Sequence, residues 1–445
     1  MKILLINPTA QYLYKTAQDM SEFPSLGLAY LASPLIKAGF DVFYTSAIDP
    51  KKLKTKIKKI NPDVTVIGDL YWRTYFAFMF PVMRRIAQDV KTILPECLNI
   101  LTGSFTSCYP LETLNTQGID AIIIGEGEDI LLPLITTLTN KHYKKPLNLA
   151  GGLIKKESSI IGKNNLCLVK DLNSLIFPTR RIFDRQNIKG SHGRYLSSHV
   201  EQMLVSRGCP FSCDFCLTHT IYGSIRRTRS VDNVVEEICQ LRKNNIVSYI
   251  IFWDDLFTFD ENFTIELCQK IKKFKIKWSC NTRADFVNEN LLKIMKESGC
   301  QSILYGVESS DEKNLVSVSP SKFKNDFKQT TNIAFRLTNQ AGISPVASLI
   351  VGFPDHSKKE VIADFNYAKS LHPARIYIRP ALPIPGTKFY KKLLLNNIIK
   401  PWQNWQPEKL STPPYGYPIL SRHLTRIQLN NLLFKIKTDN PKYFK

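Results

Sequence analysis

The chain has 445 residues, of which 44% are hydrophobic and 22% charged, a composition that excludes a disordered chain and indicates two or three folded domains. Its ten cysteines are too sparse for a disulfide-stapled scaffold, so we expect a reducing, cytoplasmic setting. No apolar run approaches the ~18–20 residues of a membrane-spanning helix. We interpret the apolar N-terminus as a buried strand rather than a signal peptide.

The first 140 residues alternate short β-branched runs with amphipathic segments. The predicted strands are Ile3–Ile6, Val42–Tyr44, Val64–Ile67, Asn99–Leu101 and Ala121–Ile124. The predicted helices are Leu26–Lys37, Lys51–Ile60, Phe76–Leu94 and Asp129–Leu138. This alternation is typical of a doubly wound, Rossmann-like (flavodoxin-like) parallel α/β sheet, and we assign residues 1–140 to it.

Ligands of such sheets bind beyond the carboxyl ends of the strands. The candidate ligand-binding residues at these ends are Pro8, Gly103, Ser104, Gly125, Glu126, Gly127 and Glu128. Neither a dinucleotide fingerprint nor a phosphate-binding loop follows the first strand, which makes NAD and nucleoside triphosphates poor candidates. A sheet domain that binds nothing stays an open alternative.

Residues 141–198 are irregular and predict a linker with a small β-excursion. Six further strand–helix units follow, and they predict a partial (β/α)6 barrel over residues 199–390. Its predicted strands are Gln202–Ser206, Tyr249–Phe252, Ile276–Ser279, Ser302–Leu304, Val346–Val351 and Arg375–Ile378. Residues 391–445 form a C-terminal extension.

Three cysteines, Cys209, Cys213 and Cys216, lie within eight residues directly after a predicted strand. Soft thiolates select zinc or iron–sulfur centres, and three thiolates leave one iron of a cluster open to an outside ligand. A structural zinc site with His219 as the fourth ligand is the alternative, and unligated core cysteines are another. The remaining seven cysteines are scattered singly and are interpreted as small buried hydrophobes.

The C-x3-C-x2-C loop, with Phe215 before its last cysteine, resembles that of the radical S-adenosylmethionine (SAM) enzymes. In that family three cysteines hold a [4Fe–4S] cluster whose fourth iron is chelated by SAM. Downstream strand-end segments agree with the family in order, which implies further contacts to SAM. The residues concerned are Asp254, Asp255, Asn281, Arg283, Gly306 and Glu308. The resemblance also implies a cofactor contact for Phe215 in the cysteine loop.

Residues 1–140 resemble the cobalamin-binding domain that precedes one subgroup of this family. Two departures stand out: the chain has no D-x-H-x-x-G segment, and Phe105 stands where many relatives have a histidine. The lower axial ligand of cobalt therefore stays unassigned. The catalytic residues also stay unassigned.

The resemblance implies three cofactors, a [4Fe–4S] cluster, SAM and cobalamin, and a methyltransferase acting on an unactivated carbon through a 5′-deoxyadenosyl radical and methylcobalamin. One alternative keeps both cofactors but catalyses ring closure or rearrangement. Another is a radical SAM enzyme that modifies tRNA, and a third is a non-enzymatic zinc- or cobalamin-binding regulator. The implied partners are a small-molecule, lipid or peptide substrate and an electron donor such as flavodoxin or ferredoxin.

The net charge of +22 is unevenly distributed along the sequence. Residues 1–140 hold 13 basic and 13 acidic side chains, whereas residues 376–445 hold 12 Lys and Arg against Glu408 and Asp439. A basic extension of this kind is compatible with weak contact to an anionic membrane or a nucleic acid, and also with an ordinary solvated surface. A covering helix packed on the barrel is the preferred interpretation of its apolar positions.

Overall fold

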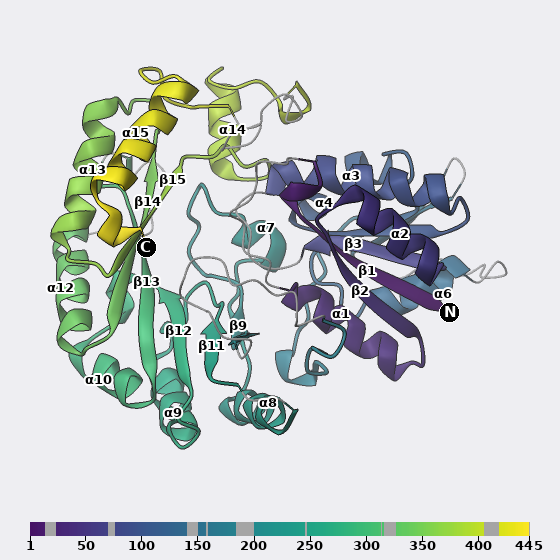
Figure 1. The fold of residues 1–445 in the computed structure, drawn as a ribbon, viewed down its shortest axis with the longest axis horizontal. Helices are drawn as coiled ribbons and strands as arrows, with labels where there is room; N and C mark the ends of the chain where they lie inside the picture. Colours follow the sequence, from purple (N-terminus) through teal and green to yellow (C-terminus); the bar gives the residue numbers. More distant parts are fainter. Residues whose placement is uncertain are drawn as a thin grey trace.

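A computed structural model describes residues 1–13, 24–69, 76–139, 150–156, 159–183, 200–244, 247–312, 314–315, 326–404 and 418–444. The chain forms two lobes, each built on its own sheet, and helix α7 lies between them (Figure 1). Within the described residues, no helix is both long and apolar enough to cross a bilayer.

The N-terminal lobe contains a seven-stranded sheet of order β2-β1-β3-β4-β5-β6-β7. Its strands are β1 (Lys2–Pro8), β2 (Asp41–Ala47), β3 (Val64–Asp69), β4 (Leu98–Gly103), β5 (Ala121–Ile123), β6 (Gly152–Lys156) and β7 (Ser159–Gly162). The first five strands are parallel, in the 2-1-3-4-5 order of flavodoxin-like folds, which confirms the predicted architecture. The last two are antiparallel, so described residues of the predicted linker extend this sheet.

Helices cover both faces of the N-terminal sheet. They are α1 (Leu26–Lys37), α2 (Pro50–Ile60), α3 (Phe76–Ile93), α4 (Ser104–Cys108), α5 (Pro110–Leu114) and α6 (Leu131–Thr139). Helices α1 and α6 pack on one face, whereas α2 and α3 pack on the other. Helix α2 shows why these boundaries could be predicted: Asp49 caps its first turn by accepting from the Lys52 amide at 3.0 Å, Pro50 follows, and Asn61 ends it in a left-handed conformation.

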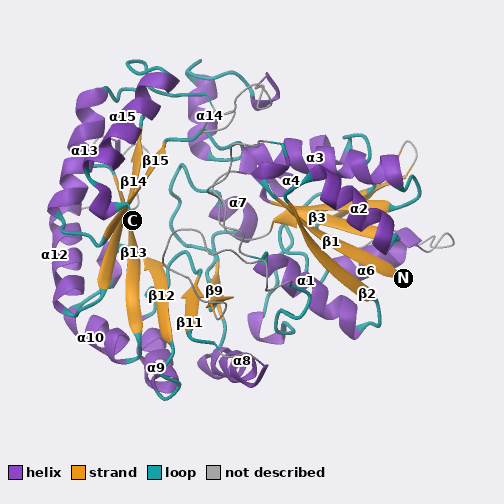
Figure 2. Ribbon diagram, in the orientation of Figure 1, coloured by secondary structure: helices purple, strands orange, loops and turns teal. Residues whose placement is uncertain are grey.

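The second lobe is an open barrel of six parallel strands in the order β15-β14-β13-β12-β11-β8. These strands are β8 (Val200–Met203), β11 (Tyr249–Phe252), β12 (Lys277–Thr282), β13 (Cys300–Glu308), β14 (Ser344–Val351) and β15 (Arg375–Pro380). Its main helices are α8 (Val231–Asn244), α9 (Glu261–Lys272), α10 (Glu289–Glu297), α12 (Phe327–Gln340) and α13 (Lys358–Ser370). They line the outer side of the curved sheet (Figure 2), as predicted for a partial barrel.

A short antiparallel hairpin lies between β8 and α8. Strand β9 (Ser206–Arg207) pairs with β10 (Arg227–Thr228), and the segment between them contains the cysteine loop and α7 (Thr218–Tyr222). This hairpin brings Arg207 directly opposite Arg227.

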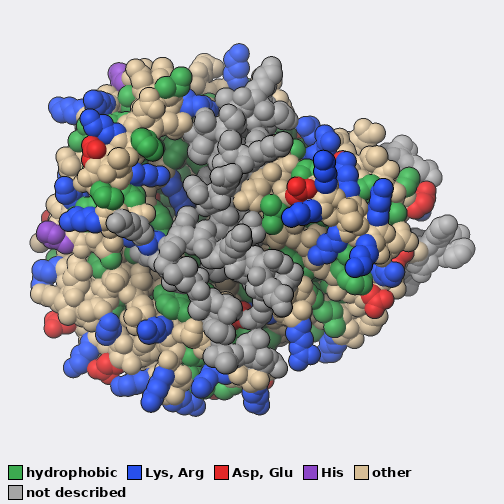
Figure 3. Space-filling model, in the orientation of Figure 1, with side chains coloured by type: hydrophobic (Ala, Val, Ile, Leu, Met, Phe, Trp, Pro, Cys, Tyr) green, Lys and Arg blue, Asp and Glu red, His purple; other side chains and the backbone are tan. Residues whose placement is uncertain are grey.

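The C-terminal extension contributes α14 (Lys388–Leu395), which overlaps the predicted end of the barrel, and α15 (Arg426–Asp439). Leu429, Leu432 and Ile436 of α15 are buried in the barrel core, which confirms the preferred interpretation as a covering helix. Lys and Arg side chains are spread over the visible face of both lobes instead of forming one patch (Figure 3).

The two lobes share a continuous hydrophobic contact. Leu217 and Ile221, in and just before α7, belong to the same buried cluster as the inner face of α3, and so do Leu382 and Ile384 after β15. Helix α4 packs against α7. The lobes are thus held together by a core as well as by polar contacts.

Candidate functional site

The cysteine loop begins immediately after β9 and depends on a glycine. Gly208 has φ +87°, and a Cβ there would lie 2.4 Å from the backbone oxygen of Ile225. Only glycine combines this conformation with so close an approach. The strand pair β9–β10 therefore fixes the point from which Cys209 enters the loop, and a turn from the Cys213 oxygen to the Cys216 amide (3.0 Å) closes it.

The side chains of Cys209, Cys213 and Cys216 form no disulfide and are partly buried. Burial raises the pKa of Cys209 to about 11 and that of Cys216 to about 12. The Cys216 thiol donates to the Thr218 hydroxyl oxygen (3.1 Å), and its sulfur accepts from the Thr218 backbone N–H (3.5 Å). A bound metal would hold these thiols as thiolates, and three soft donors with a hydrogen-bonded sulfur fit an iron–sulfur cluster.

The alternative zinc ligand, His219, lies in α7. In the part of the chain that the structure describes, no three His, Cys, Asp or Glu side chains converge closely enough to hold a single metal ion.

Asp254, at the end of β11, supports the start of the cysteine loop. Its fully buried carboxylate accepts from the backbone of Val205 (3.2 Å) and from both the amide and the hydroxyl of Ser206 (each 2.5 Å). We predicted a cofactor contact here, but the carboxylate is directed at the chain's own backbone. The physical reason is that a buried carboxylate is stable only when donors surround it.

Asp255 faces the cysteine loop instead. Its side chain accepts from the Thr218 hydroxyl at 3.3 Å, and Thr218 also contacts Cys216. Asp255 is accessible to solvent, yet surrounding protein atoms and the nearby Asp254 carboxylate raise its pKa to about 6. Of the two acids, Asp255 is the one placed to meet a group bound at the cysteines.

Arg283, just after β12, packs directly on the loop. Its guanidinium lies 3.9 Å from the ring centre of Phe211, which lies between Cys209 and Cys213, and forms a two-point ion pair with Asp285 (2.8 and 2.6 Å). This stacking holds Phe211 against the barrel. Phe215, predicted as a cofactor contact, packs against a hydrophobic cluster with Phe353 and Phe389, so its ring serves packing.

The remaining predicted barrel residues lie on neighbouring strands. Asn281 on β12 donates to the Asp254 backbone oxygen at 3.3 Å. Gly306 and Glu308 flank a register shift near the end of β13, and Glu308 has a left-handed φ of +66°. The structure thus brings both to the strand ends on the same edge as Asn281 and Asp255.

Glu126 and Glu128 are buried in ion pairs with the second lobe. Arg227 binds Glu126 at two points (2.7 Å each), and Arg207 contacts Glu128 at 2.8 Å. We predicted both glutamates as cofactor contacts; the structure pairs them with arginines, and a cofactor contact stays a prediction. Buried carboxylates need charged partners, and the hairpin supplies two.

Gly125 and Gly127 also approach the chain itself. A Cβ on Gly125 would lie 2.3 Å from the Cys167 oxygen, and one on Gly127 would lie 3.0 Å from Leu31. The backbone at Cys167 and Leu31 of α1 therefore lie where a side chain at these positions would stand, while the predicted contact of both glycines with a ligand stays a prediction. Gly125 N–H donates to the Ser107 hydroxyl at 2.9 Å.

Pro8, Gly103 and Ser104 lie at the carboxyl ends of β1 and β4, where the sequence predicted them. Gly103 has φ +116°, and buried Ser104 begins α4. The neighbouring Phe105 stacks on Phe80 with ring centres 4.3 Å apart. Apolar packing therefore replaces the histidine found in many relatives.

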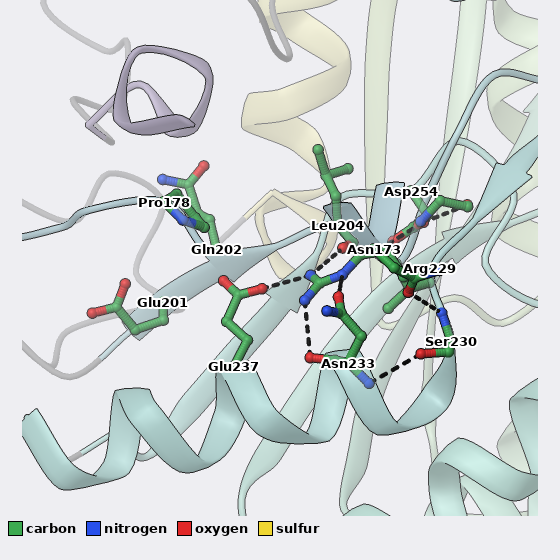
Figure 4. A network of polar contacts seen from close by, with 12 residues as sticks. Asn173, Pro178, Glu201, Gln202, Leu204, Arg229, Ser230, Asn233, Glu237 and Asp254 are labelled. Carbon is green, nitrogen blue, oxygen red and sulfur yellow. Dashed lines mark hydrogen bonds and ion pairs between the residues drawn. The ribbon is translucent and has the colours of Figure 1, made fainter. Parts of the chain in front are cut away.

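Sequence reasoning missed several residues that support the loop. Arg229 binds Glu237 (2.5 Å), the Leu204 oxygen (3.0 Å) and Asn233 (2.6 Å), as Figure 4 shows. Arg180 binds Glu237 at 2.8 Å from the other side. The only sequence signal for these contacts was the arginine-rich run 226–229, because partners distant in sequence cannot be read from one chain.

Comparisons with known proteins agree with this geometry. Residues 203–368 match the radical SAM superfamily, and residues 16–135 match the B12 binding domain. The matched segments confirm the predicted cofactors: a [4Fe–4S] cluster and SAM in the barrel, and cobalamin in the N-terminal lobe.

Among curated proteins, the chain is 28% identical over 442 residues to an uncharacterized methyltransferase of Pyrococcus horikoshii, covering 98% of this chain and 91% of the relative. It is 23% identical to the cytidylyl-2-hydroxyethylphosphonate methyltransferase of Streptomyces wedmorensis, covering 90% and 83%.

Two solved structures share the fold. The radical SAM methyltransferase TsrM from Kitasatospora setae matches with a TM-score of 0.69 at 16% identity, covering 89% of this chain and 75% of that one. The cobalamin-dependent radical SAM enzyme OxsB matches with a TM-score of 0.71 at 16% identity, covering 99% and 67%. From the cysteine loop, the two-lobed fold and both family matches, the chain belongs to the radical SAM enzymes that carry an N-terminal cobalamin-binding domain.

Proposed function

We propose that this protein is a cobalamin-dependent radical SAM methyltransferase that methylates an unactivated carbon. The observation that carries the proposal is one chain in which a loop with three cysteines in no disulfide is fixed against a flavodoxin-like lobe of the B12 binding type. A relative that spans 98% of the chain is named a methyltransferase. A cyclase relative, 24% identical over 409 residues, keeps ring closure as the second candidate.

The residues have separate tasks in this proposal. Cys209, Cys213 and Cys216 would hold the cluster, and the strand ends that carry Asp255, Asn281, Gly306 and Glu308 would bind SAM. The bound groups supply reductive cleavage of SAM, hydrogen abstraction and methyl donation from cobalt. Asp254 and Arg283 hold the loop in place, so that the reacting atoms meet in a fixed geometry.

The N-terminal lobe would present cobalamin from the ends of β1 and β4, at Pro8, Gly103 and Ser104. Phe105 offers cobalt no nitrogen ligand, so any lower ligand must come from elsewhere. The substrate class in this proposal is a small molecule, and the electron donor is a flavodoxin or ferredoxin in the cytoplasm. Membrane or nucleic-acid contact through the basic extension stays a prediction.

The test is a labelling experiment that needs no substrate. The purified, anaerobically reconstituted protein is given cobalamin, a strong reductant and SAM labelled in its methyl group. A methyltransferase transfers label to the corrinoid and releases S-adenosylhomocysteine, both measured by chromatography. Formation of 5′-deoxyadenosine without either product would reject methyl transfer and favour the cyclase.

A further inference from the structure

Four buried charged residues join the two lobes beside the cysteine loop. Glu126 and Glu128 come from the turn between β5 and α6, whereas Arg207 and Arg227 come from the β9–β10 hairpin. The side chains of Glu126, Glu128 and Arg207 are each at most 4% exposed, and that of Arg227 is 11% exposed. We call these four residues the clamp.

The hairpin makes the clamp necessary. Arg207 and Arg227 are direct cross-strand partners, so two positive charges lie side by side in a buried place. Like charges in this position repel, unless opposite charges lie between them. Glu126 contacts both arginines, at 2.7 Å to Arg227 and 3.5 Å to Arg207, and together with Glu128 it balances their two positive charges.

Further contacts hold the clamp on the side of the N-terminal lobe. Glu126 accepts from the Val169 amide at 2.5 Å, and Arg207 lies over the ring of Tyr30 in α1, 5.0 Å from its centre. Only Gly208 separates Arg207 from the first cluster cysteine, and the Gly208 backbone lies against that of Ile225. The contacts of Arg207 with the N-terminal lobe therefore act on the chain two residues before Cys209.

We infer that the clamp is a positioning device that fixes the cysteine loop relative to the cobalamin-binding lobe. This inference rests on the proposed function, in which the two cofactors must face one substrate. The four residues do not touch the reacting atoms. They set the distance and orientation between the two cofactor sites by holding the last residue before the loop.

A contact from Glu128 to cobalamin is the competing explanation, because its Oε2 atom is buried without a hydrogen-bond partner among the described residues. The experiment therefore compares Glu128→Gln, Arg207→Gln and the double variant in the full-length, reconstituted protein. Glu297→Gln is the matched control, since Glu297 pairs with Lys272 at 3.0 Å on the surface. Hydrogen exchange of residues 204–217, iron and corrinoid content, and the magnetic interaction between cob(II)alamin and the reduced cluster are measured.

If the clamp positions the loop, each single variant keeps its iron and corrinoid. The backbone amide hydrogens of residues 204–217 then exchange roughly tenfold faster than in wild type, and the magnetic interaction between the two cofactors is altered. Hydrogen exchange at residues 204–217 in the double variant should be no faster than in the faster single variant, because neither charge of the Glu128–Arg207 pair is then left without its partner. The double variant also covers the case in which a single variant fails to fold.

Two results would overturn the inference. One is loss of corrinoid from Glu128→Gln with unchanged exchange at 204–217, which would make Glu128 a cofactor contact. The other is unchanged exchange in every variant. If the wild-type chain binds no corrinoid at all, the proposed function fails, while the exchange comparison still tests the clamp.

Discussion

Thiols in this chain divide into two kinds by position. Cys209, Cys213 and Cys216 share one loop, whereas Cys268, Cys280 and Cys300 are buried in the barrel core. Burial raises the pKa of Cys268 to about 12, as expected of an inert core thiol. Cysteine thus serves chemistry in the loop and packing in the barrel core.

Replacing any one loop cysteine by alanine should abolish the cluster, because two thiolates cannot retain it with one iron open. Cys213→Ala is expected to lose the brown chromophore and SAM cleavage after reconstitution. Cys239→Ala, on α8, should keep both and serves as the control. Iron and sulfide analysis with absorbance spectra measures the outcome, and a cleaving Cys213→Ala protein would contradict the assignment.

Gly208 offers a test of how tightly the loop is fixed. Gly208 and Gly39 have nearly the same backbone conformation, φ +87° and +84°, but a Cβ at Gly39 would meet nothing within 4 Å. Gly39→Ala should cost about 1 kcal/mol for the left-handed conformation alone. Gly208→Ala should cost roughly 1–3 kcal/mol more, because the clash is with backbone, and should lower the bound iron.

Thermal unfolding of the two alanine variants measures that difference. Equal melting temperatures, with normal iron in both, would mean that the turn before Cys209 can relax.

Helix α13 illustrates how an element depends on its first turn. Ser357 and Glu360 form a reciprocal capping box, with the Ser357 amide donating to Glu360 at 2.8 Å. Hydrogen bonds from the Ser357 side chain and backbone lower the pKa of Glu360 to about 2. The helix runs along the outer side of the barrel from the end of β14, so its first turn follows closely on a strand end.

This low pKa predicts a pH dependence of stability. The unfolded carboxyl binds its proton near the ordinary value of 4.5, so the stabilisation is full above that pH and is lost as pH falls toward 2. Glu360→Gln should therefore be less stable than wild type at pH 7, and the difference should shrink below about pH 4.5. Melting temperatures across this range measure it, and a constant difference would show that the charge is irrelevant.

The junction between the lobes has an aromatic contact as well as the clamp. Trp402, from the C-terminal extension, meets Phe105 edge-on at 4.8 Å and Phe80 at 5.9 Å. Gly386 lies so near Cys108 that a Cβ would be 2.4 Å from its sulfur. The extension therefore reaches back to the lobe where the chain began.

Trp402→Ala should weaken this junction by roughly 1–3 kcal/mol. This is less than the cost of replacing a fully buried tryptophan, because Trp402 is only partly buried. Calorimetry should show a lower first transition and an earlier separation of the two lobes. Leu395→Ala is the control, since Leu395 is 82% exposed. An unchanged temperature of the first transition in Trp402→Ala would show that Trp402 does not hold the two lobes together.

The sequence by itself determined the local structure and the cluster site. Runs of β-branched residues, caps such as Asp49, and the spacing of Cys209, Cys213 and Cys216 are short-range signals that act within a few residues. Helix α1 begins and ends where the pattern predicted, and the six barrel strands lie where the alternation placed them.

Only the tertiary structure decided what the polar side chains at the strand ends do. Glu126 and Arg227 are 101 positions apart, and Asp254 and Ser206 are 48 apart, so no local pattern could pair them. A buried charge takes whichever partner the fold brings near, because leaving it unpaired costs several kcal/mol. For that reason the sequence could identify these residues as special, while the fold determined that they hold the cysteine loop in place.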